Sequence, residues 1–302
     1  MRICLFNVEN LFILLDVYNN QNLDLVTEEE WQSYTISLNQ PNKPLCDLIG
    51  IKKTIEEIDA DIFMLCEIGG KESLDNFNNL FLDNKYDVYV KEGNSNRGIC
   101  VGYLVKKGSP YSFTVRTNKD TLLDDGHKIT RDILELRAYK KGKLKLINLL
   151  VHLKSKRTSK KDLNGIKKRT SEVKAVLGLY KKLKDKYKVP IILSGDFNGH
   201  AQKSDPEDEF IEIYKTDLLD AHEVVNSSEE DRTSFVSFYT KKILRQLDYI
   251  FLSKDIHSKI SNVYNAKFKN EYGDCLGIPD SFQEKKWLPS DHFPVVVDLD
   301  LK

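Results

Sequence analysis

Short apolar runs alternate with polar segments along the whole chain, and most of these runs are too short to form helices. The clearest one, at residues 189–200, reads VPIILSGDFNGH, and its β-branched and aliphatic residues end at Ser194 and Gly195. A run of this length between a proline and a glycine is typical of a buried strand. The same pattern predicts further strands at residues 2–6, 62–66, 86–91, 99–106, 130–139, 144–153, 234–239, 247–252 and 295–301.

Two segments instead repeat their apolar residues every three or four positions, as one face of a helix does. Residues 48–58 form the shorter of these predicted helices, and residues 166–187 form the longer one, with apolar residues inward and lysines outward. Residues 13–50 contain Asn, Gln and Pro throughout. We therefore expect a long irregular excursion on the surface there.

The predicted strands outnumber the predicted helices, and no shift in composition marks a linker within the 302 residues. The pattern predicts at least eight strands in one domain, which is more than a single open sheet usually contains. We therefore expect one α/β domain over residues 1–302 in which two packed sheets are covered by outer helices.

Polar side chains recur at the ends of the predicted strands. A ligand set rich in carboxylate and amide oxygens suits a hard cation such as Mg²⁺ or Mn²⁺ and suits zinc poorly. Such a cation neutralises the charge that develops in phosphate chemistry, and histidine is the side chain poised to take a proton from water near neutral pH. The residues concerned are Asn7, Glu9, Glu67, His152, Asp196, Asn198, Asp248, Asp291 and His292.

Asp248 is the carboxylate that we pair with His292, because a carboxylate behind a histidine fixes its tautomer and favours the imidazolium. Structural interpretations remain open for several of these residues. Residues 194–198 could form a surface turn, since Gly, Asp and Asn are common turn residues. Glu67 and Asp248 could be turn residues as well, and His152 could be a hydrogen-bonded histidine of the core.

The formal net charge is zero, yet the charges are unevenly distributed. Residues 154–188 contain fourteen Lys or Arg and three acidic residues, whereas residues 205–231 contain eleven acidic residues and one Lys. Most lysines of the first segment are typical of the solvated face of a helix. Lys154, Lys156 and Arg157 differ, because they directly follow His152, and a basic rim beside a metal site is what a polyanionic substrate requires.

The five cysteines match neither a CxxC pair nor a Cys/His zinc pattern, so we expect reduced and mostly buried thiols. Asn7, Glu9 and Asn10 interrupt the first apolar stretch before a signal-peptide core could form. No apolar run reaches the length of a membrane span. We therefore expect a cytoplasmic protein without a transmembrane segment. Protein partners are unknown from the sequence.

Six motifs together resemble those of the endonuclease/exonuclease/phosphatase family of Mg²⁺-dependent phosphodiesterases. Any one of them is weak evidence, whereas the set in the family's order is highly specific. RDIL at residues 131–134 and the basic helix after HLKSKR are most similar to a bacterial branch of nucleases. Between residues 3 and 301 the motifs are FNVENLF, DIFMLCE, VHLKSKR, SGDFN, RQLDYIF and PSDHFP.

The resemblance implies the family's α/β fold, a four-layer sandwich of two packed mixed β-sheets flanked by helices. It also implies that Glu67 is the principal Mg²⁺ ligand, assisted by Asn7 and Glu9, and that Asp291 completes the metal shell. Mn²⁺ is the expected substitute. The residues that we expect to contact the substrate are Asn7, Arg97, Arg131, Lys154, Lys156 and Arg157.

The resemblance further implies how water would attack the phosphorus. His292, oriented by Asp248, is the general base, while Asp196 orients or deprotonates the water; which of His292 and Asp196 takes the proton stays open. Asn198 would position the phosphate and His152 would stabilise the pentacovalent phosphorus.

Two departures from the family pattern concern the surroundings of these residues. Gly199 and His200 stand where the family often has an acidic residue after SGDFN, which puts an accessory contact in doubt. Residues 14–49 match no motif and would shape the substrate site.

The resulting hypothesis is a metal-dependent hydrolase that cleaves the phosphodiester bonds of a nucleic acid, DNA or RNA. The alternative is a phosphatase or phospholipase C-type enzyme acting on inositol phosphates or sphingolipid headgroups, which the absence of an apolar membrane-docking run disfavours. A third hypothesis, a binding module without catalysis, is disfavoured because every matched position carries a competent residue.

Overall fold

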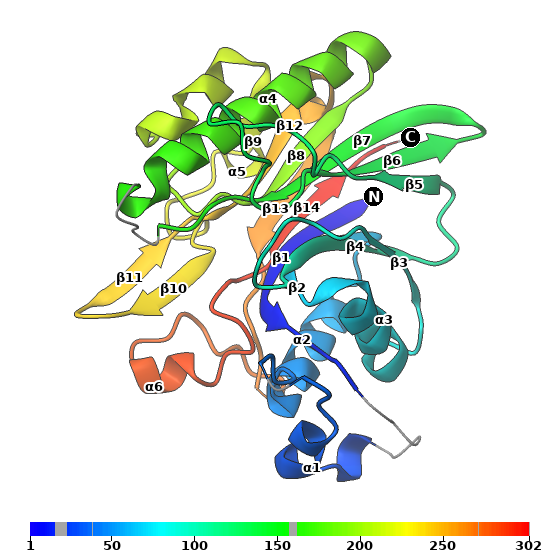
Figure 1. The fold of residues 1–302 in the computed structure, drawn as a ribbon, viewed down its shortest axis with the longest axis vertical. Coiled ribbons are helices and arrows are strands. Elements are labelled where there is room, and N and C mark those ends of the chain that lie inside the picture. Colours follow the sequence, from blue (N-terminus) through cyan, green and yellow to red (C-terminus); the bar gives the residue numbers. More distant parts are fainter. Residues whose placement is uncertain (16–22, 38, 157–161, 271, 302) are drawn as a thin grey trace.

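The computed structural model describes residues 1–15, 23–37, 39–156, 162–270 and 272–301. Within these residues two six-stranded mixed sheets pack face to face, and helices cover their outer faces (Figure 1). The expected four-layer α/β sandwich is therefore confirmed. No helix among the described residues is both long and apolar enough to cross a membrane.

The first sheet contains both ends of the chain, because its central strands β1 and β14 pair antiparallel with each other. Strand β1 also pairs with β2 in parallel, so the ends of these two strands lie at the same edge of the sheet. In spatial order the strands are β13 (Ile260–Asn265), β14 (Val295–Leu299), β1 (Arg2–Leu11), β2 (Ile62–Ile68), β4 (Cys100–Lys106) and β3 (Tyr86–Val90).

The second sheet is built around the parallel pair of β7 and β8, with β12 antiparallel to β8 on its other side. Its strands in spatial order are β5 (Ser112–Arg116), β6 (Leu134–Lys140), β7 (Lys143–His152), β8 (Ile191–Asp196), β12 (Asp248–Ser253) and β9 (Leu218–Asp220). Strands β10 (Phe235–Phe238) and β11 (Lys242–Arg245) form a separate hairpin that extends from the body of the molecule (Figure 1).

Alternating side chains of the strands divide the interior into layers. In β1, Ile3 and Leu5 point into the core between the two sheets, whereas Cys4 and Phe6 point toward the helices on the outer face. This alternation follows from the period of two of a strand, and it lets both faces of a central strand be buried.

The outer layers are helical. On the first sheet lie α1 (Glu28–Ser33), α2 (Leu45–Ile58) and α3 (Gly70–Phe81), and on the second lie α4 (Ile166–Tyr187) and the 3-10 helix η3 (Asp208–Lys215). The remaining elements are short: η1 (Leu23–Leu25), η2 (Leu163–Gly165), α5 (Ala221–Val224), η4 (Lys254–Lys259) and α6 (Phe282–Lys285).

The excursion expected at residues 13–50 is less irregular than its sequence indicated. Thr27 and Glu30 form a capping box that starts α1, and Trp31 of that helix is fully buried, donating from Nε1 to the carbonyl of Lys43. Helix α2 also begins at Leu45, three residues before the predicted start. The prediction of a long surface excursion is therefore wrong, because Trp31, together with Ile13, Leu45 and Leu48, is buried in the core and attaches this segment to it.

Several other elements differ from expectation. Strands β5 and β13 and helix α3 were not predicted, because their apolar residues are few and each is flanked by polar ones. The strand expected at residues 234–239 exists, but as β10 of the hairpin and not as part of either sheet. The strand expected from residue 130 begins only at Leu134.

Gly195 allows the parallel strands β7 and β8 to approach where the polar residues gather. Its φ is +150°, and a Cβ atom at this position would lie 1.9 Å from the carbonyl oxygen of Val151. No other residue type fits such a contact without displacing the backbone. The glycine of SGDFN thus has a steric function directly before Asp196.

Candidate active site

Asp196 lies at the centre of the polar cluster, because strand register places two other site residues directly beside it. On one side the last residue of β7, His152, is paired with Asp196, and on the other the first residue of β12, Asp248, is paired with it. All three side chains are almost completely buried. One edge of the second sheet therefore presents a histidine and two carboxylates on three adjacent strands.

The first sheet contributes Asn7 and Glu67 to the same place. The Nδ2 amide of Asn7 donates to Oδ2 of Asp196 at 3.1 Å, and Oε1 of Glu67 lies 3.6 Å from Nε2 of His152. Asn198 completes the surroundings of Asp196: its backbone N–H donates to Oδ1 at 2.8 Å and its side-chain amide to Oδ2 at 3.1 Å. The two sheets thus meet around one buried carboxylate.

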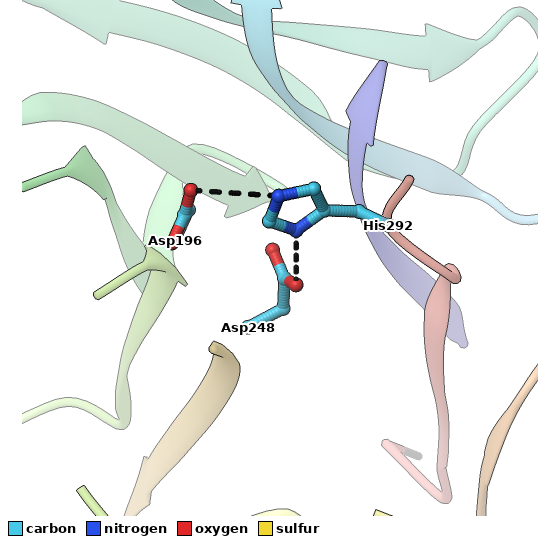
Figure 2. A group of neighbouring side chains, drawn as sticks. All are labelled: Asp196, Asp248 and His292. Carbon is cyan, nitrogen blue, oxygen red and sulfur yellow. Dashed lines mark hydrogen bonds and ion pairs between the residues drawn. The ribbon is translucent and has the colours of Figure 1, made fainter. Parts of the chain in front are cut away.

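His292 reaches the cluster from the loop before β14 and is hydrogen bonded to Asp248 (Figure 2). Its Nδ1 lies 2.7 Å from Oδ2 of Asp248, and its Nε2 points toward Oδ2 of Asp196 at 4.0 Å. Oδ1 of Asp291 also lies 3.8 Å from Nε2, so three carboxylates surround the imidazole. Only the one behind it is within hydrogen-bonding distance, which leaves Nε2 available to a ligand.

The three titratable groups of the cluster have different pKa values because their neighbours differ. Burial opposes protonation of His292, but the charge of Asp248 and its hydrogen bond prevail and raise the pKa of the imidazole well above its ordinary value. Burial, followed by the charges of Arg131 and His292, lowers the pKa of His152 well below its ordinary value. His292 is therefore cationic near neutral pH, and His152 is neutral.

Burial has the opposite effect on the carboxyl group of Asp196, whose pKa it raises to about 7 although His292 lowers it. The negative charges of Asp248 and Glu67 contribute to the increase. A carboxylate that exchanges its proton near pH 7 is well matched to accepting one from water under physiological conditions.

The backbone is strained at three of the polar strand ends. Glu9, Glu67 and Asn198 have φ angles of +45°, +63° and +52°, a region that residues other than glycine rarely occupy. Strained backbone of this kind persists where the surrounding structure enforces it, and it concentrates at functional sites. The strain directs these side chains to one place at the meeting point of the sheets.

The carboxylates of Glu9 and Asp291 are close neighbours next to this cluster. Oε2 of Glu9 accepts a hydrogen bond from the backbone N–H of Asp291 at 3.0 Å, and Lys285 pairs with Asp291 at 3.2 Å. Burial, followed by the charge of Asp291, raises the pKa of Glu9. The region is rich in carboxylate oxygens that a cation would stabilise.

Among the described residues, one group of His, Cys, Asp and Glu side chains brings its possible metal ligands together. Asp196, Asp248 and His292 each offer a ligand atom, and these atoms lie within 4.8 Å of one another. The set expected from the sequence consists of the oxygens of Asn7, Glu9, Glu67 and Asp291, and its three carboxylates do not form so compact a group.

Sequence comparison finds no matching family model and no matching curated protein. Solved structures, in contrast, match over the full length. A D. rerio TDP2 complexed with a single-strand DNA product is 15% identical, with a TM-score of 0.64, over 100% of this chain and 99% of that one. An endonuclease/exonuclease/phosphatase family protein from Bacteroides thetaiotaomicron is 16% identical, with a TM-score of 0.57, over 100% and 98%.

The chain has the endonuclease/exonuclease/phosphatase fold. The fold recognised from six motifs is therefore confirmed by the arrangement of the backbone. A mannosyl-6-phosphatase of Bacteroides thetaiotaomicron shares it as well, at 17% identity and a TM-score of 0.56 over 100% of both chains. Because these identities are low, the likeness concerns the fold, and the chemistry must be argued from the side chains.

The basic residues expected to bind substrate occupy different places around the site of this endonuclease/exonuclease/phosphatase fold. Arg131 is buried behind His152, where its guanidinium donates to the carbonyls of His152 and Leu153 at 2.8 and 3.1 Å. Arg97 is exposed and donates to Oδ1 of Asn10 at 2.8 Å. The structure thus separates a residue that holds the His152 backbone from one that faces solvent.

Lys154 and Lys156 follow His152 in a loop at the rim. Lys156 forms an ion pair with Glu207, and Lys154 Nζ donates to the carbonyl of Ser155 at 3.0 Å. Arg157, also expected to bind substrate, lies outside the described residues. A basic cleft of about 1140 Å³ extends from this rim, lined among others by Arg97, Arg131, Lys154, Lys167, Lys168 and Lys174.

Sequence reasoning missed two serines that organise the site. Ser234 Oγ donates to Oδ2 of Asp248 at 2.8 Å and accepts from the backbone N–H groups of Leu247 and Asp248 at 3.0 Å. Ser290 Oγ donates to the carbonyl of Asn7 at 2.7 Å and accepts from the N–H of His292 at 3.1 Å. Ser290 stands in the PSDHFP motif and could have been found there; nothing in the sequence around Ser234 distinguishes it.

Proposed function

We propose that this protein is a metal-dependent phosphodiesterase that cleaves DNA or RNA by attack of an activated water on phosphorus. One observation carries the proposal: Asp196 accepts from the amides of Asn7 and Asn198, and Nε2 atoms of His152 and His292 lie 3.4 and 4.0 Å from its Oδ2. A buried carboxylate between two differently charged histidines can take a proton while donors hold the phosphate.

Asp196 is the group that we assign to the proton of the attacking water. His292 is already protonated near neutral pH because of Asp248. It is therefore better suited to donate a hydrogen bond to a phosphate oxygen than to act as the base. The pKa of Asp196 is raised to about 7, which suits this carboxylate to act as the general base near neutral pH. Of the two alternatives that the sequence left open, we therefore propose Asp196 as the base.

His152 and Asn198 are assigned to the phosphate. His152 is neutral, and its Nε2 faces the cluster, so this atom can donate a hydrogen bond without adding a charge. Arg131 fixes the backbone of His152 from behind and acts as a positioning residue. The amide of Asn198 is held beside Asp196 and can reach a phosphate oxygen from the adjacent side.

The residues present fit Mg²⁺, with Mn²⁺ as a substitute. Asn7, Glu9, Glu67 and Asp291 offer only oxygen atoms, which these cations prefer, and the raised pKa of Glu9 reflects negative charge that a cation would offset. Bound there, the ion would neutralise charge on the phosphate oxygens. The set that includes Asp248 and His292 suits it less, since their shared hydrogen bond already occupies one ligand atom of each.

The test is a substrate panel with the purified protein, containing plasmid DNA, single-stranded DNA and RNA, inositol phosphates and a sphingolipid headgroup. We expect Mg²⁺-dependent cleavage of nucleic acid that Glu67→Ala abolishes. Glu72→Ala, on the exposed surface of α3, is the matched control and should cleave as the wild type does. Release of phosphate or headgroup without nucleic-acid cleavage would favour the phosphatase or phospholipase C-type alternative.

A further inference from the structure

A second cleft, of about 660 Å³, is lined by residues of the rim loop, of the β10–β11 hairpin and of α6. The hairpin and α6 lie next to each other at the same end of the molecule (Figure 1). Asn198 and Asp291, two residues of the candidate site, form part of its wall. Four aromatic side chains are among its other lining residues, and we call it the aromatic cleft: Phe235, Phe238, Tyr239 and Phe282.

The aromatic cleft continues directly from the candidate site. Phe235 packs against the imidazole of His292, with ring centroids 4.9 Å apart. At the outer rim, Tyr239 in the hairpin turn is 88% exposed and Phe282 at the start of α6 is 56% exposed. Single exposed rings are common on protein surfaces, but exposed rings that gather along one cleft form an apolar patch of the kind that marks a binding surface.

Cationic side chains outnumber carboxylates in the lining of the aromatic cleft, which favours binding of a polyanion. Three cationic side chains line it, Lys156, Arg245 and Lys285, against one carboxylate, Asp291. Lys156 and Lys285 are each paired with a carboxylate, whereas Arg245 is exposed and forms no ion pair within the described part of the chain. An arginine beside exposed rings offers both a phosphate contact and a flat surface for stacking.

The two clefts differ in chemistry although they share Ser155. No Phe, Tyr or Trp is among the described residues that line the basic cleft, whose lining offers charges for phosphates and one small ring, the imidazole of His127. The aromatic cleft offers cationic groups and four larger rings. A linear nucleic acid that crosses the site would therefore meet most of the base-stacking surface on one side of the scissile phosphate.

We propose that the aromatic cleft binds unpaired bases of a single-stranded nucleic acid whose phosphodiester lies at Asp196. The inference rests on the proposed function and specifies its substrate class. Stacking on aromatic side chains requires a base whose face is free, and it tolerates any base because each has a π-face. In a duplex the neighbouring pairs cover both faces, so single strands and unpaired ends are the substrates that this surface selects.

The experiment compares kcat/KM for a single-stranded oligonucleotide with kcat/KM for methyl 4-nitrophenyl phosphate, a diester without a base, both in Mg²⁺. In Tyr239→Ala and in Phe282→Ala we expect the ratio of the two values to fall on the order of tenfold for each lost ring. Tyr239→Trp keeps a stacking surface and should keep the ratio. Tyr272→Ala is the control, because Tyr272 is 81% exposed and does not line the cleft.

A binding measurement separates this inference from the proposed function. An oligonucleotide with one 2-aminopurine is titrated with protein in EDTA, and quenching of its fluorescence reports stacking. We expect quenching by the wild type and its loss in the Tyr239→Ala/Phe282→Ala double variant. If the wild type hydrolyses neither substrate, the proposed function fails while the quenching still tests the cleft. The cleft assignment would be overturned if the double variant and Tyr272→Ala had equal ratios of the two kcat/KM values, or equal quenching. Equal cleavage of a blunt duplex and a single strand would also overturn it.

Discussion

Nδ1 of His292 lies 2.7 Å from Oδ2 of Asp248, although 44 residues separate the two in the chain. The contact joins a loop of the first sheet to a strand of the second, and both side chains are buried. Burial alone would lower the pKa of His292, and the charge and hydrogen bond of Asp248 are the largest of the contributions that raise it. The orientation and the charge of His292 therefore depend on how the two sheets pack together.

Asp248→Asn is expected to lower the pKa of His292 and to reduce kcat on the order of 100-fold, the contribution typical of one proton donor or acceptor. Loss of the carboxylate removes the charge that favours the imidazolium. The pKa is measured from the histidine resonances by NMR, and kcat on an oligonucleotide. An unchanged His292 pKa in the folded variant would contradict the assignment.

Asp196→Asn tests the raised pKa of Asp196 through stability as well as activity. Folding raises this pKa from 3.8 to about 7, so the native state gains protons, and the contribution of Asp196 is most favourable below pH 4 and is lost as the pH rises to about 7. Between pH values well below 4 and well above 7, this contribution to the free energy of unfolding changes by about 4 kcal/mol. The unfolding free energy of the variant minus that of the wild type, both measured in EDTA, should therefore be larger at pH 8 than at pH 5.

Urea unfolding of the wild type and Asp196→Asn at several pH values gives this comparison. The other titratable groups are present in both proteins, so the difference between their unfolding free energies reports the titration of Asp196 together with its coupling to His292. A difference that does not change between pH 5 and pH 8 would show that the carboxyl group is not perturbed by folding. Activity of the variant is expected to be lost at every pH.

Metal binding should discriminate the two sets of candidate ligands. If the ion binds the oxygens of Asn7 and Glu67, then Glu67→Gln weakens Mn²⁺ binding at least tenfold, while Asp248→Asn changes it little. Calorimetry or the Mn²⁺ electron paramagnetic resonance signal reports binding without turnover. The reverse order of effects would place the ion at Asp196, Asp248 and His292, the group whose ligand atoms lie within 4.8 Å of one another.

Gly195→Ala is expected to destabilise the protein by several kcal/mol or to prevent folding, because its Cβ atom would lie 1.9 Å from the Val151 carbonyl oxygen. Gly178→Ala is the matched control. It lies inside α4, and a Cβ there meets no atom within 4 Å, so alanine should stabilise the helix by about 0.5–1 kcal/mol. Thermal unfolding of both variants measures the contrast, and similar effects would contradict the steric argument.

Local patterns were sufficient to predict most of the architecture. Apolar runs of strand length and the helical period of residues 166–187 depend on neighbouring residues alone, so β1, β2, β7, β8, β12 and α4 were recognisable. Elements with few apolar residues, such as α3 and β5, were missed because their burial comes from partners distant in the chain.

By itself the sequence determined which polar residues stand at strand ends, because strand length and turn composition are local properties. The tertiary structure alone decided which of them meet: strand pairing placed His152 and Asp248 on either side of Asp196, and the packing of the sheets brought Asn7 to the same carboxylate. Burial and neighbouring charges then separated the pKa values of the two histidines. Such effects depend on distances in space, which no spacing along the chain specifies.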